Sequence, residues 1–205
     1  MKLLKKTVLL SFVLVLFVSG SCSDDEEFRP TLPPITQTGS NTFGCYIDGK
    51  LLTPRDGAGT LHTQDKGVRM IAGGIPREIT YWELKVRDFK SGNGGLLTFH
   101  IQNLHQNKKG VYVINEGNCE VGVDALENVN ITCRWLDKET QNYKWYCSIE
   151  NGGTLTITRY DFENRIVSGT FSCTVQNRDD ATDTVEITEG RFDLKWDTLP
   201  YTNFH

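Results

Sequence analysis

Cysteine is the residue type with the most chemistry to offer in this chain. The sequence contains six cysteines, and one of them, Cys22, stands apart near the N-terminus. Cys133 and Cys147 flank the polar stretch 137–142, so a hairpin formed by the segments on either side would bring the two thiols opposite each other at disulfide distance. We therefore predict a Cys133–Cys147 disulfide. The alternative is that all five cysteines after Cys22 are small buried hydrophobic residues.

No other residues form a pattern typical of catalysis or metal binding. The sequence has no HExxH motif, no GxSxG elbow and no cysteine or histidine spacing typical of zinc. His100 alternates with apolar neighbours and is expected to face outward, and the acidic segment 177–183 is expected to be a solvated hairpin loop rather than a calcium site. The distance between the two carboxylates that cleave a glycosidic bond is set by tertiary structure, and the sequence singles out no such pair. We expect no catalytic residue, no metal and no cofactor.

Aromatic residues bear on whether the protein could stack a sugar ring. By their place in alternating segments, all four tryptophans point with the apolar side chains and are predicted to be core: Trp82, Trp135, Trp145 and Trp196. Tyr81, Tyr143 and Tyr146 are then the candidates for exposed rings that stack a ligand.

Two threonines are candidates for modification. Thr184 and Thr198 each follow an aspartate and precede an apolar residue, a pattern similar to the O-glycosylation sequon of some Gram-negative envelope proteins. We expect both to lie at strand ends, where a sugar could be accommodated. The high β-propensity of threonine explains both residues equally well.

The first 21 residues are predicted to be a signal peptide. Three lysines precede the eleven-residue apolar stretch 8–18, and small residues lead up to Cys22. This ending resembles the lipobox of bacterial lipoproteins, although serine stands at position 19 where leucine is usual. The resemblance implies lipidation of Cys22, with several acyl chains that give stable membrane anchoring. A secreted protein cut near Gly20 is the alternative.

A tether is expected to follow the anchor over residues 22–40. It begins with four acidic residues at 24–27 and continues through Pro30, Pro33 and Pro34. The acidic run resembles the signal that sends some lipoproteins across the outer membrane, which implies display on the extracellular side. Retention on the periplasmic leaflet is the alternative.

The charge of the chain limits the partners it can have. The formal net charge of the 205 residues is −4, and removal of residues 1–21 takes away three lysines and no acids, which gives about −7 for the mature chain. A protein that binds by neutralising phosphates needs the opposite balance. We therefore expect no nucleic-acid partner.

The remaining chain, residues 41–205, is predicted to be one all-β domain. Apolar residues alternate with polar ones in several segments, such as 81–86, 154–158, 167–175 and 191–196, and turn residues interrupt the chain every 10 to 20 positions. This pattern is typical of antiparallel sheets with one face dry. We expect a single antiparallel β-sandwich or partly closed barrel of roughly ten to twelve strands, with a short helical turn at 123–127.

Both ends of this domain resemble a family of small Gram-negative bacterial surface lipoproteins of uncharacterised function. The head segment is LPPITQTGSNTFGC, residues 32–45, and the tail segments are GTLTIT, SGTF and ITEGRFDL, within residues 153–194. The resemblance fades between about 55 and 150. It implies an all-β, lipid-anchored domain and transfers no catalytic or binding residues.

Taken together, these features predict a surface-exposed outer-membrane lipoprotein that acts as a non-catalytic binding or accessory module. Its expected partners are the membrane, through the lipid, and a glycan or another envelope protein. Two alternatives remain open: a surface hydrolase acting on glycans, and a structural or assembly subunit of the cell surface.

Overall fold

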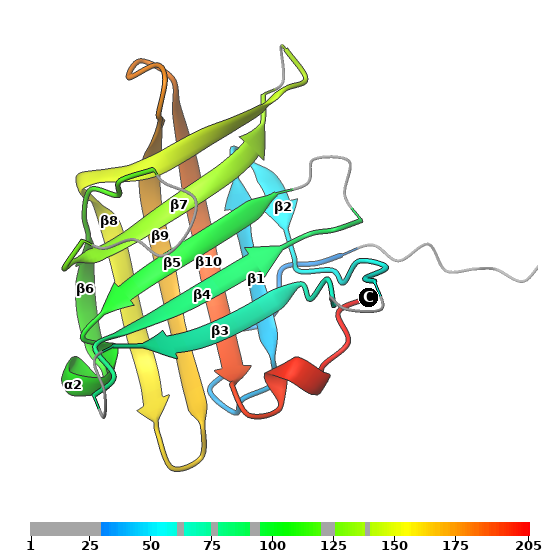
Figure 1. The fold of residues 1–205 in the computed structure, drawn as a ribbon, viewed down its shortest axis with the longest axis vertical. Helices are drawn as coiled ribbons and strands as arrows, with labels where there is room; N and C mark the ends of the chain where they lie inside the picture. The colour runs from blue at the N-terminus through cyan, green and yellow to red at the C-terminus, as the bar shows by residue number, and fades with distance from the viewer. Residues whose placement is uncertain (1–29, 61–63, 75–77, 91–94, 120–125, 138–139) are drawn as a thin grey trace, which may run out of the picture.

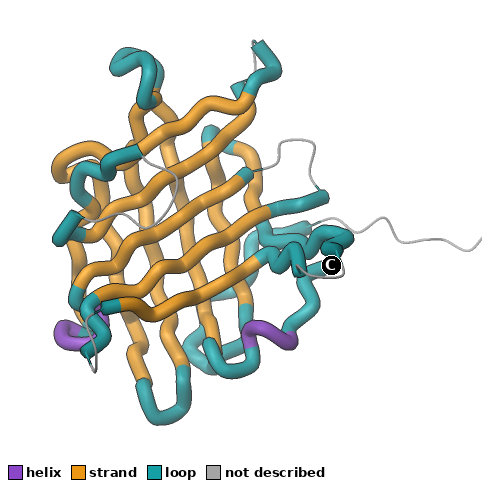
Figure 2. The backbone as a smooth tube through the Cα atoms, in the orientation of Figure 1, coloured by secondary structure: helices purple, strands orange, loops and turns teal. Residues whose placement is uncertain are grey.

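The computed structural model describes residues 30–60, 64–74, 78–90, 95–119, 126–137 and 140–205. Strands make up most of this part of the chain, with two short helical segments (Figure 2). The elements are β1 Thr42–Ile47, β2 Lys50–Leu52, β3 Val68–Gly73, β4 Tyr81–Arg87, β5 Leu96–Gln102, α2 Leu104–Asn107, β6 Gly110–Ile114, β7 Val129–Leu136, β8 Tyr143–Asp161, β9 Ile166–Asn177, β10 Thr184–Lys195 and the 3-10 helix η1 Leu199–Tyr201.

The ten described strands form one curled sheet in the order β2-β1-β10-β9-β8-β6-β7-β5-β4-β3. In Figure 1, β3, β4, β5 and β7 lie in front of β1, β10, β9 and the far half of β8, and cross them at a steep angle. All extended pairings are antiparallel, and the parallel contact between β6 and β7 is one residue pair. The prediction of an all-β fold is therefore confirmed, and of the two predicted architectures, sandwich and partly closed barrel, the sheet forms the partly closed barrel.

Strand β8 joins the two layers because it is long and bent. Its first part pairs with β7 up to Cys147, and its second part pairs with β6 from Gly153 onward. The pairing register with β9 shifts between Ser148 and Gly153. A side chain on Gly153 would meet the carbonyl oxygen of Ser172 at 2.2 Å, so only glycine permits this close approach of β8 to β9.

The open side of the barrel, between the edge strands β2 and β3, is bridged by the segment around Arg55. The N–H of Arg55 donates to the Arg87 carbonyl at 3.2 Å, and the Phe89 N–H donates to the Arg55 carbonyl at 3.1 Å. The Arg55 guanidinium also binds both carboxylate oxygens of Asp88 at 2.8 Å. These contacts hold the end of β4 in place.

The core contains a phenylalanine cluster and three free thiols. The Phe171 ring centre lies 4.7 Å from that of Phe99 and 5.6 Å from that of Phe43. Such offset and edge contacts add to the hydrophobic stabilisation of buried rings. The free cysteines of the described chain are all buried, as expected of small hydrophobic residues: Cys45, Cys133 and Cys173.

A buried carboxylate fastens the chain before β1 to the end of β10. Asp193 is 1% exposed, and its carboxylate accepts hydrogen bonds from the Thr36 hydroxyl at 2.7 Å, the Thr38 and Gly39 backbone N–H groups at 2.8 Å, and the Ser168 hydroxyl at 2.7 Å. Burial alone raises the pKa of this carboxyl, but the hydrogen bonds outweigh burial and hold the pKa well below its usual range.

This contact brings together the head and tail segments on which the family resemblance is based. Leu32 and Pro33 pack so closely on Gly44 in β1 that a side chain there would overlap them. Asn41 continues the attachment, because its side-chain oxygen accepts the Lys195 N–H at 2.7 Å. Residues 36–40, assigned to the tether from sequence, are thus bound to β10.

We expect Asp193→Asn to lower the free energy of unfolding by about 3 kcal/mol at pH 7, since hydrogen bonds to a charged group each contribute about 1.5–3 kcal/mol. A carboxyl whose pKa is lowered by folding stabilises the protein above its unfolded pKa of about 3.9 and loses this contribution as the pH falls further. The difference between wild type and variant should therefore shrink below about pH 4. Urea unfolding at pH 7 and pH 3 measures this difference in the free energy of unfolding.

The exposed Asp197→Asn variant is the control and should match the wild type at both pH values. A pH-independent difference for Asp193→Asn would contradict the role assigned to the carboxylate.

Candidate functional site

Three arginines and a tryptophan lie in one row across the outer face of the sheet. Arg87 in β4 is opposite Leu96 in β5, Leu96 is opposite Arg134 in β7, and Arg134 is opposite Trp145 in β8. The N–H of Arg178, which follows β9, donates to the Trp145 carbonyl at 2.9 Å and extends the row. Residues directly opposite on neighbouring strands point to the same face. We name Arg87, Arg134, Trp145 and Arg178 the arginine row.

Aromatic rings hold two of these guanidinium groups in place. The Arg134 guanidinium carbon lies 4.7 Å from the centre of the Tyr143 ring and 5.9 Å from that of Trp145. The Arg87 guanidinium lies 4.4 Å from the Phe89 ring centre. Tyr143 is 44% exposed and Trp145 is half-buried. The result is a patch of rings and cations that is partly exposed to solvent.

The same two arginines lack acceptors within the described parts of the chain. The Nε atoms of Arg87 and Arg134 are buried and have no hydrogen-bond partner there. Neither guanidinium forms an ion pair with a described carboxylate. Arg178 pairs with its neighbour Asp179 at 3.2 Å, but the Asp179 side chain is 72% exposed, and such pairs contribute little. The row can therefore accept an anionic ligand.

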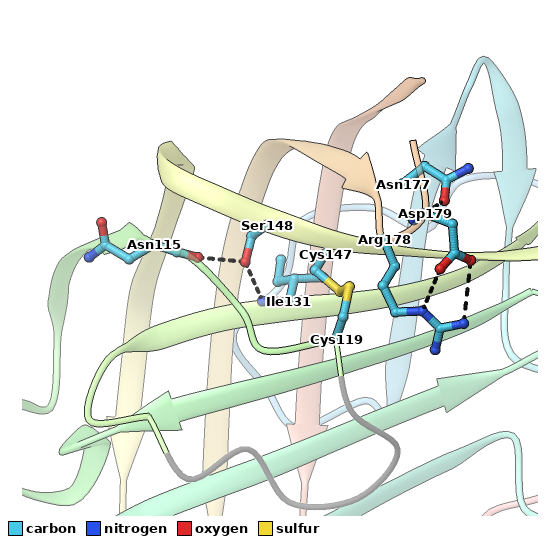
Figure 3. Close-up of a disulfide and its surroundings, with 8 residues drawn as sticks. All are labelled: Asn115, Cys119, Ile131, Cys147, Ser148, Asn177, Arg178 and Asp179. Carbon is cyan, nitrogen blue, oxygen red and sulfur yellow. Dashed lines mark hydrogen bonds and ion pairs between the residues drawn. A yellow bond between two sulfur atoms is a disulfide. The ribbon is translucent and has the colours of Figure 1, made fainter. Parts of the chain in front are cut away.

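A hollow of about 390 Å³ adjoins the row beside a disulfide (Figure 3). Its lining includes Arg178, Gln176, Cys119 and Cys147. Cys147 lies two residues after Trp145 in β8 and shares its face. Hollow and row are thus adjacent parts of one outer surface.

The disulfide joins Cys119 to Cys147 and holds the segment after β6 onto this face. The Gly117 N–H donates to the Ser148 carbonyl at 2.9 Å, which supports the same placement. As Figure 3 shows, the Ser148 hydroxyl donates to the Asn115 carbonyl at 2.6 Å and accepts the Ile131 N–H at 2.9 Å. Ser148 therefore satisfies backbone groups at the point where β7 and β8 separate to admit β6.

The predicted Cys133–Cys147 disulfide is wrong. Within the β7–β8 hairpin, Cys133 is opposite Tyr146, while Cys147 is opposite Thr132. The two cysteines are one register step apart, and successive residues of a strand point to opposite faces. Cys133 consequently faces the core as a free thiol, and Cys147 faces outward to Cys119.

The same alternation corrects two aromatic predictions. Tyr146 was expected to be exposed but is 3% exposed, because it lies an odd number of residues from Tyr143 and faces inward. Its hydroxyl donates to Asp183 at 3.2 Å, and burial, with Asp183 nearby, raises the pKa of Tyr146 to about 12. Trp145 was expected in the core but lies half-buried on the outer face.

The segment 177–183 is the hairpin loop between β9 and β10, exposed at residues 178–182 as expected and fixed to this same region at its two ends. The Asp183 carboxylate accepts hydrogen bonds from Lys144 at 2.9 Å and from the Asn177 side chain at 2.8 Å. The Asp137 and Asp183 carboxylates raise the pKa of Lys144 above its usual range. The lysine links the β7–β8 and β9–β10 hairpins.

The other tryptophans follow the prediction more closely. Trp82 and Trp135 are buried, and Trp196 is half-buried and packs against the core, with its ring centre 5.1 Å from that of Trp82.

His100 lies on the outer-face side of its strand, as expected, but it is only 3% exposed and forms a pair that sequence reasoning missed. Its Nδ1 lies 2.6 Å from Glu83 Oε1, and the two residues are opposite each other in β5 and β4. Tyr81, the remaining candidate for ligand stacking, is half-buried with its ring centre 5.0 Å from that of His100. It lies at the far end of β4 from Arg87. Cross-strand register alone joins Glu83 to His100, and no local motif marks the pair.

Thr184 and Thr198 are both exposed, and their glycosylation stays a prediction. Thr184 begins β10, whereas Thr198 lies just before η1, and its hydroxyl accepts a hydrogen bond from Asn41 at 3.0 Å. The signal peptide, Cys22 and residues 123–125 of the predicted helical turn lie outside the described residues.

Within the described ranges, no cluster of three His, Cys, Asp or Glu residues is arranged to hold a metal ion. No helix among those residues is long and apolar enough to cross a membrane.

We expect the native chain, expressed from residue 23, to be unreactive toward Ellman's reagent. Burial raises the pKa of the three free thiols, that of Cys173 to about 12, and the thiolate is the reacting form. Denaturation without reductant should release three thiols, and denaturation with prior reduction should release five. Peptide mapping should recover a Cys119–Cys147 link. A mapped Cys133–Cys147 link would contradict the structure.

Comparison with known proteins supplies no relative from which a function could be transferred. No family model, no curated protein and no solved structure matches the chain.

Proposed function

We propose that this chain is a lipid-anchored protein of the outer membrane that faces the cell exterior and binds a glycan without catalysing a reaction. The observation that carries the binding proposal is the platform formed by the exposed Tyr143 ring with the half-buried Trp145 and Arg134 beside it. Flat rings with a polar neighbour suit sugars, because sugar C–H groups pack on the ring while hydroxyls hydrogen-bond at its edge.

The anchor proposal is supported by the sequence before the domain. The apolar stretch 8–18, the small residues before Cys22 and the acids after it fit export and lipidation. Among the residues that the structure describes, Leu32 is the first that packs on the domain, so the proposal takes residues 23–31 as the spacer. At roughly 3.3–3.6 Å per residue this spacer reaches at most about 30 Å. A site on the domain would thus work close to the membrane surface.

Replacing Cys22 by serine in the native host removes the sulfur that would carry the lipid. The chain should then leave the membrane fraction and appear in the soluble or secreted fraction, since several acyl chains are needed for stable anchoring. Fractionation with immunodetection measures this, and Ser21→Ala, which keeps the sulfur, is the matched control. Retention of the serine variant in the membrane fraction would refute the anchor.

Removing the exposed ring of Tyr143 should weaken glycan binding. On a microarray of neutral and acidic polysaccharides, we expect the mature chain to bind and Tyr143→Ala to bind about tenfold more weakly, the effect of losing about 1.4 kcal/mol of ring contact. Tyr201→Ala is the control, because Tyr201 is 85% exposed and lies in η1, at the other end of the molecule (Figure 1). Absence of binding to every polysaccharide, or equal loss in both variants, would contradict the proposal.

A further inference from the structure

The spacing of the arginine row limits the ligand that can contact all of it. Arg87 and Arg134 are separated by one intervening strand, and so are Arg134 and Arg178. With neighbouring strands about 4.8 Å apart, the backbones carrying successive arginines are about 10 Å apart, and the row is about 20 Å long. A linear polymer with separated charges fits this arrangement better than a single small anion does.

The orientation of the arginine guanidinium groups favours a carboxylate as the charged group of the ligand. Arg87 and Arg134 each lie over an aromatic ring, so their planes are already oriented. A guanidinium binds a planar carboxylate through two parallel N–H donors. Because their Nε atoms are buried, Arg87 and Arg134 would bind such a ligand through the two terminal nitrogens of each guanidinium, for which the described chain supplies no acceptor. Orientation in advance also lowers the entropy lost on binding.

The charge of the rest of the molecule argues against a polymer of high charge density. Lys85 adds one cation to the same outer face, in the row next to Arg87 and Arg134, but Glu116 and Glu150 line the adjoining hollow, and Asp179 contacts Arg178. The mature chain carries about −7 overall. Binding to nucleic acid depends on neutralising many closely spaced phosphates. Three arginines on an acidic protein match a sparsely charged chain of sugars.

We infer that the ligand of the proposed glycan-binding face is a carboxylated polysaccharide, whose acid groups are bound by Arg87, Arg134 and Arg178 while its sugar rings pack against Tyr143 and Trp145. This inference rests on the proposed function and adds the chemical class of the ligand.

The test uses the mature chain with Cys22→Ser, so that it stays in solution, and three carboxylated polymers: polygalacturonate, alginate and hyaluronan. Each is compared with its methyl-esterified, neutral form by isothermal titration calorimetry. At least one acidic polymer should bind, and its ester should bind at least tenfold more weakly. Affinity should also fall as the salt concentration rises.

Arg134→Gln should weaken binding of the acidic polymer about tenfold or more, because it removes a charged, two-point contact. Arg134→Lys keeps the charge but loses the paired N–H donors of the guanidinium, so its affinity should lie between those of the wild type and the glutamine variant. Arg165→Gln is the matched control, since Arg165 also lies over an aromatic ring, 4.8 Å from Phe162, outside the row. Arg87→Gln provides a second variant if Arg134→Gln unfolds, as judged by circular dichroism.

Several outcomes would overturn the inference. If the neutral esters bind as tightly as the acids, or only neutral glycans bind and still require Tyr143, the charge assignment fails while the proposed function stands. If neither these polymers nor any microarray glycan binds, both fail. Equally tight binding of a single-stranded DNA oligonucleotide, lost in Arg134→Gln, would replace the polysaccharide by a nucleic acid.

Discussion

Strand β8 is the element on which the rest of the structure depends, because it pairs with β6, β7 and β9 and so belongs to both layers of the curled sheet. Its bend between Ser148 and Gly153 determines where β6 enters and where β7 leaves. Before the bend, its alternation sends Tyr146 into the core and Trp145 to the outer face. Core packing and the proposed binding face are therefore two consequences of one strand's register.

The attachment of the head segment to β10 fixes the chain that leads into the domain. Asp193 gathers hydrogen bonds from residues 36–40, which precede the first strand by only a few positions. A carboxylate that is buried and fully hydrogen-bonded holds a segment far more firmly than exposed ion pairs do. Under the proposed anchoring, this attachment keeps the spacer short and fixes where it leaves the domain.

Charge is distributed unevenly over the molecule, and this bears on the proposed function. The chain is acidic as a whole, and yet three arginines occupy one row of the outer face, two of them held by aromatic rings. Net charge governs solubility and long-range attraction, whereas a local arrangement of donors governs recognition. The net charge of the chain therefore does not describe the charge of this face.

The sequence by itself determined the fold class. Alternating apolar residues and regularly spaced turns are local properties, and they predicted an all-β fold, either an antiparallel sandwich or a partly closed barrel. It did not determine which residues meet. A one-residue difference in register separates the predicted Cys133–Cys147 disulfide from the observed Cys119–Cys147 disulfide, and the same alternation places Tyr146 inside and Trp145 outside.

Only the tertiary structure determined which residues come together in the candidate site. Arg87, Arg134 and Arg178 are distant in sequence and carry no common motif, and Glu83 meets His100 only because β4 and β5 pair in one register. The physical reason is that hydrophobic periodicity along a strand is local, whereas the pairing of one strand with another depends on side-chain packing, bends and cross-links throughout the domain.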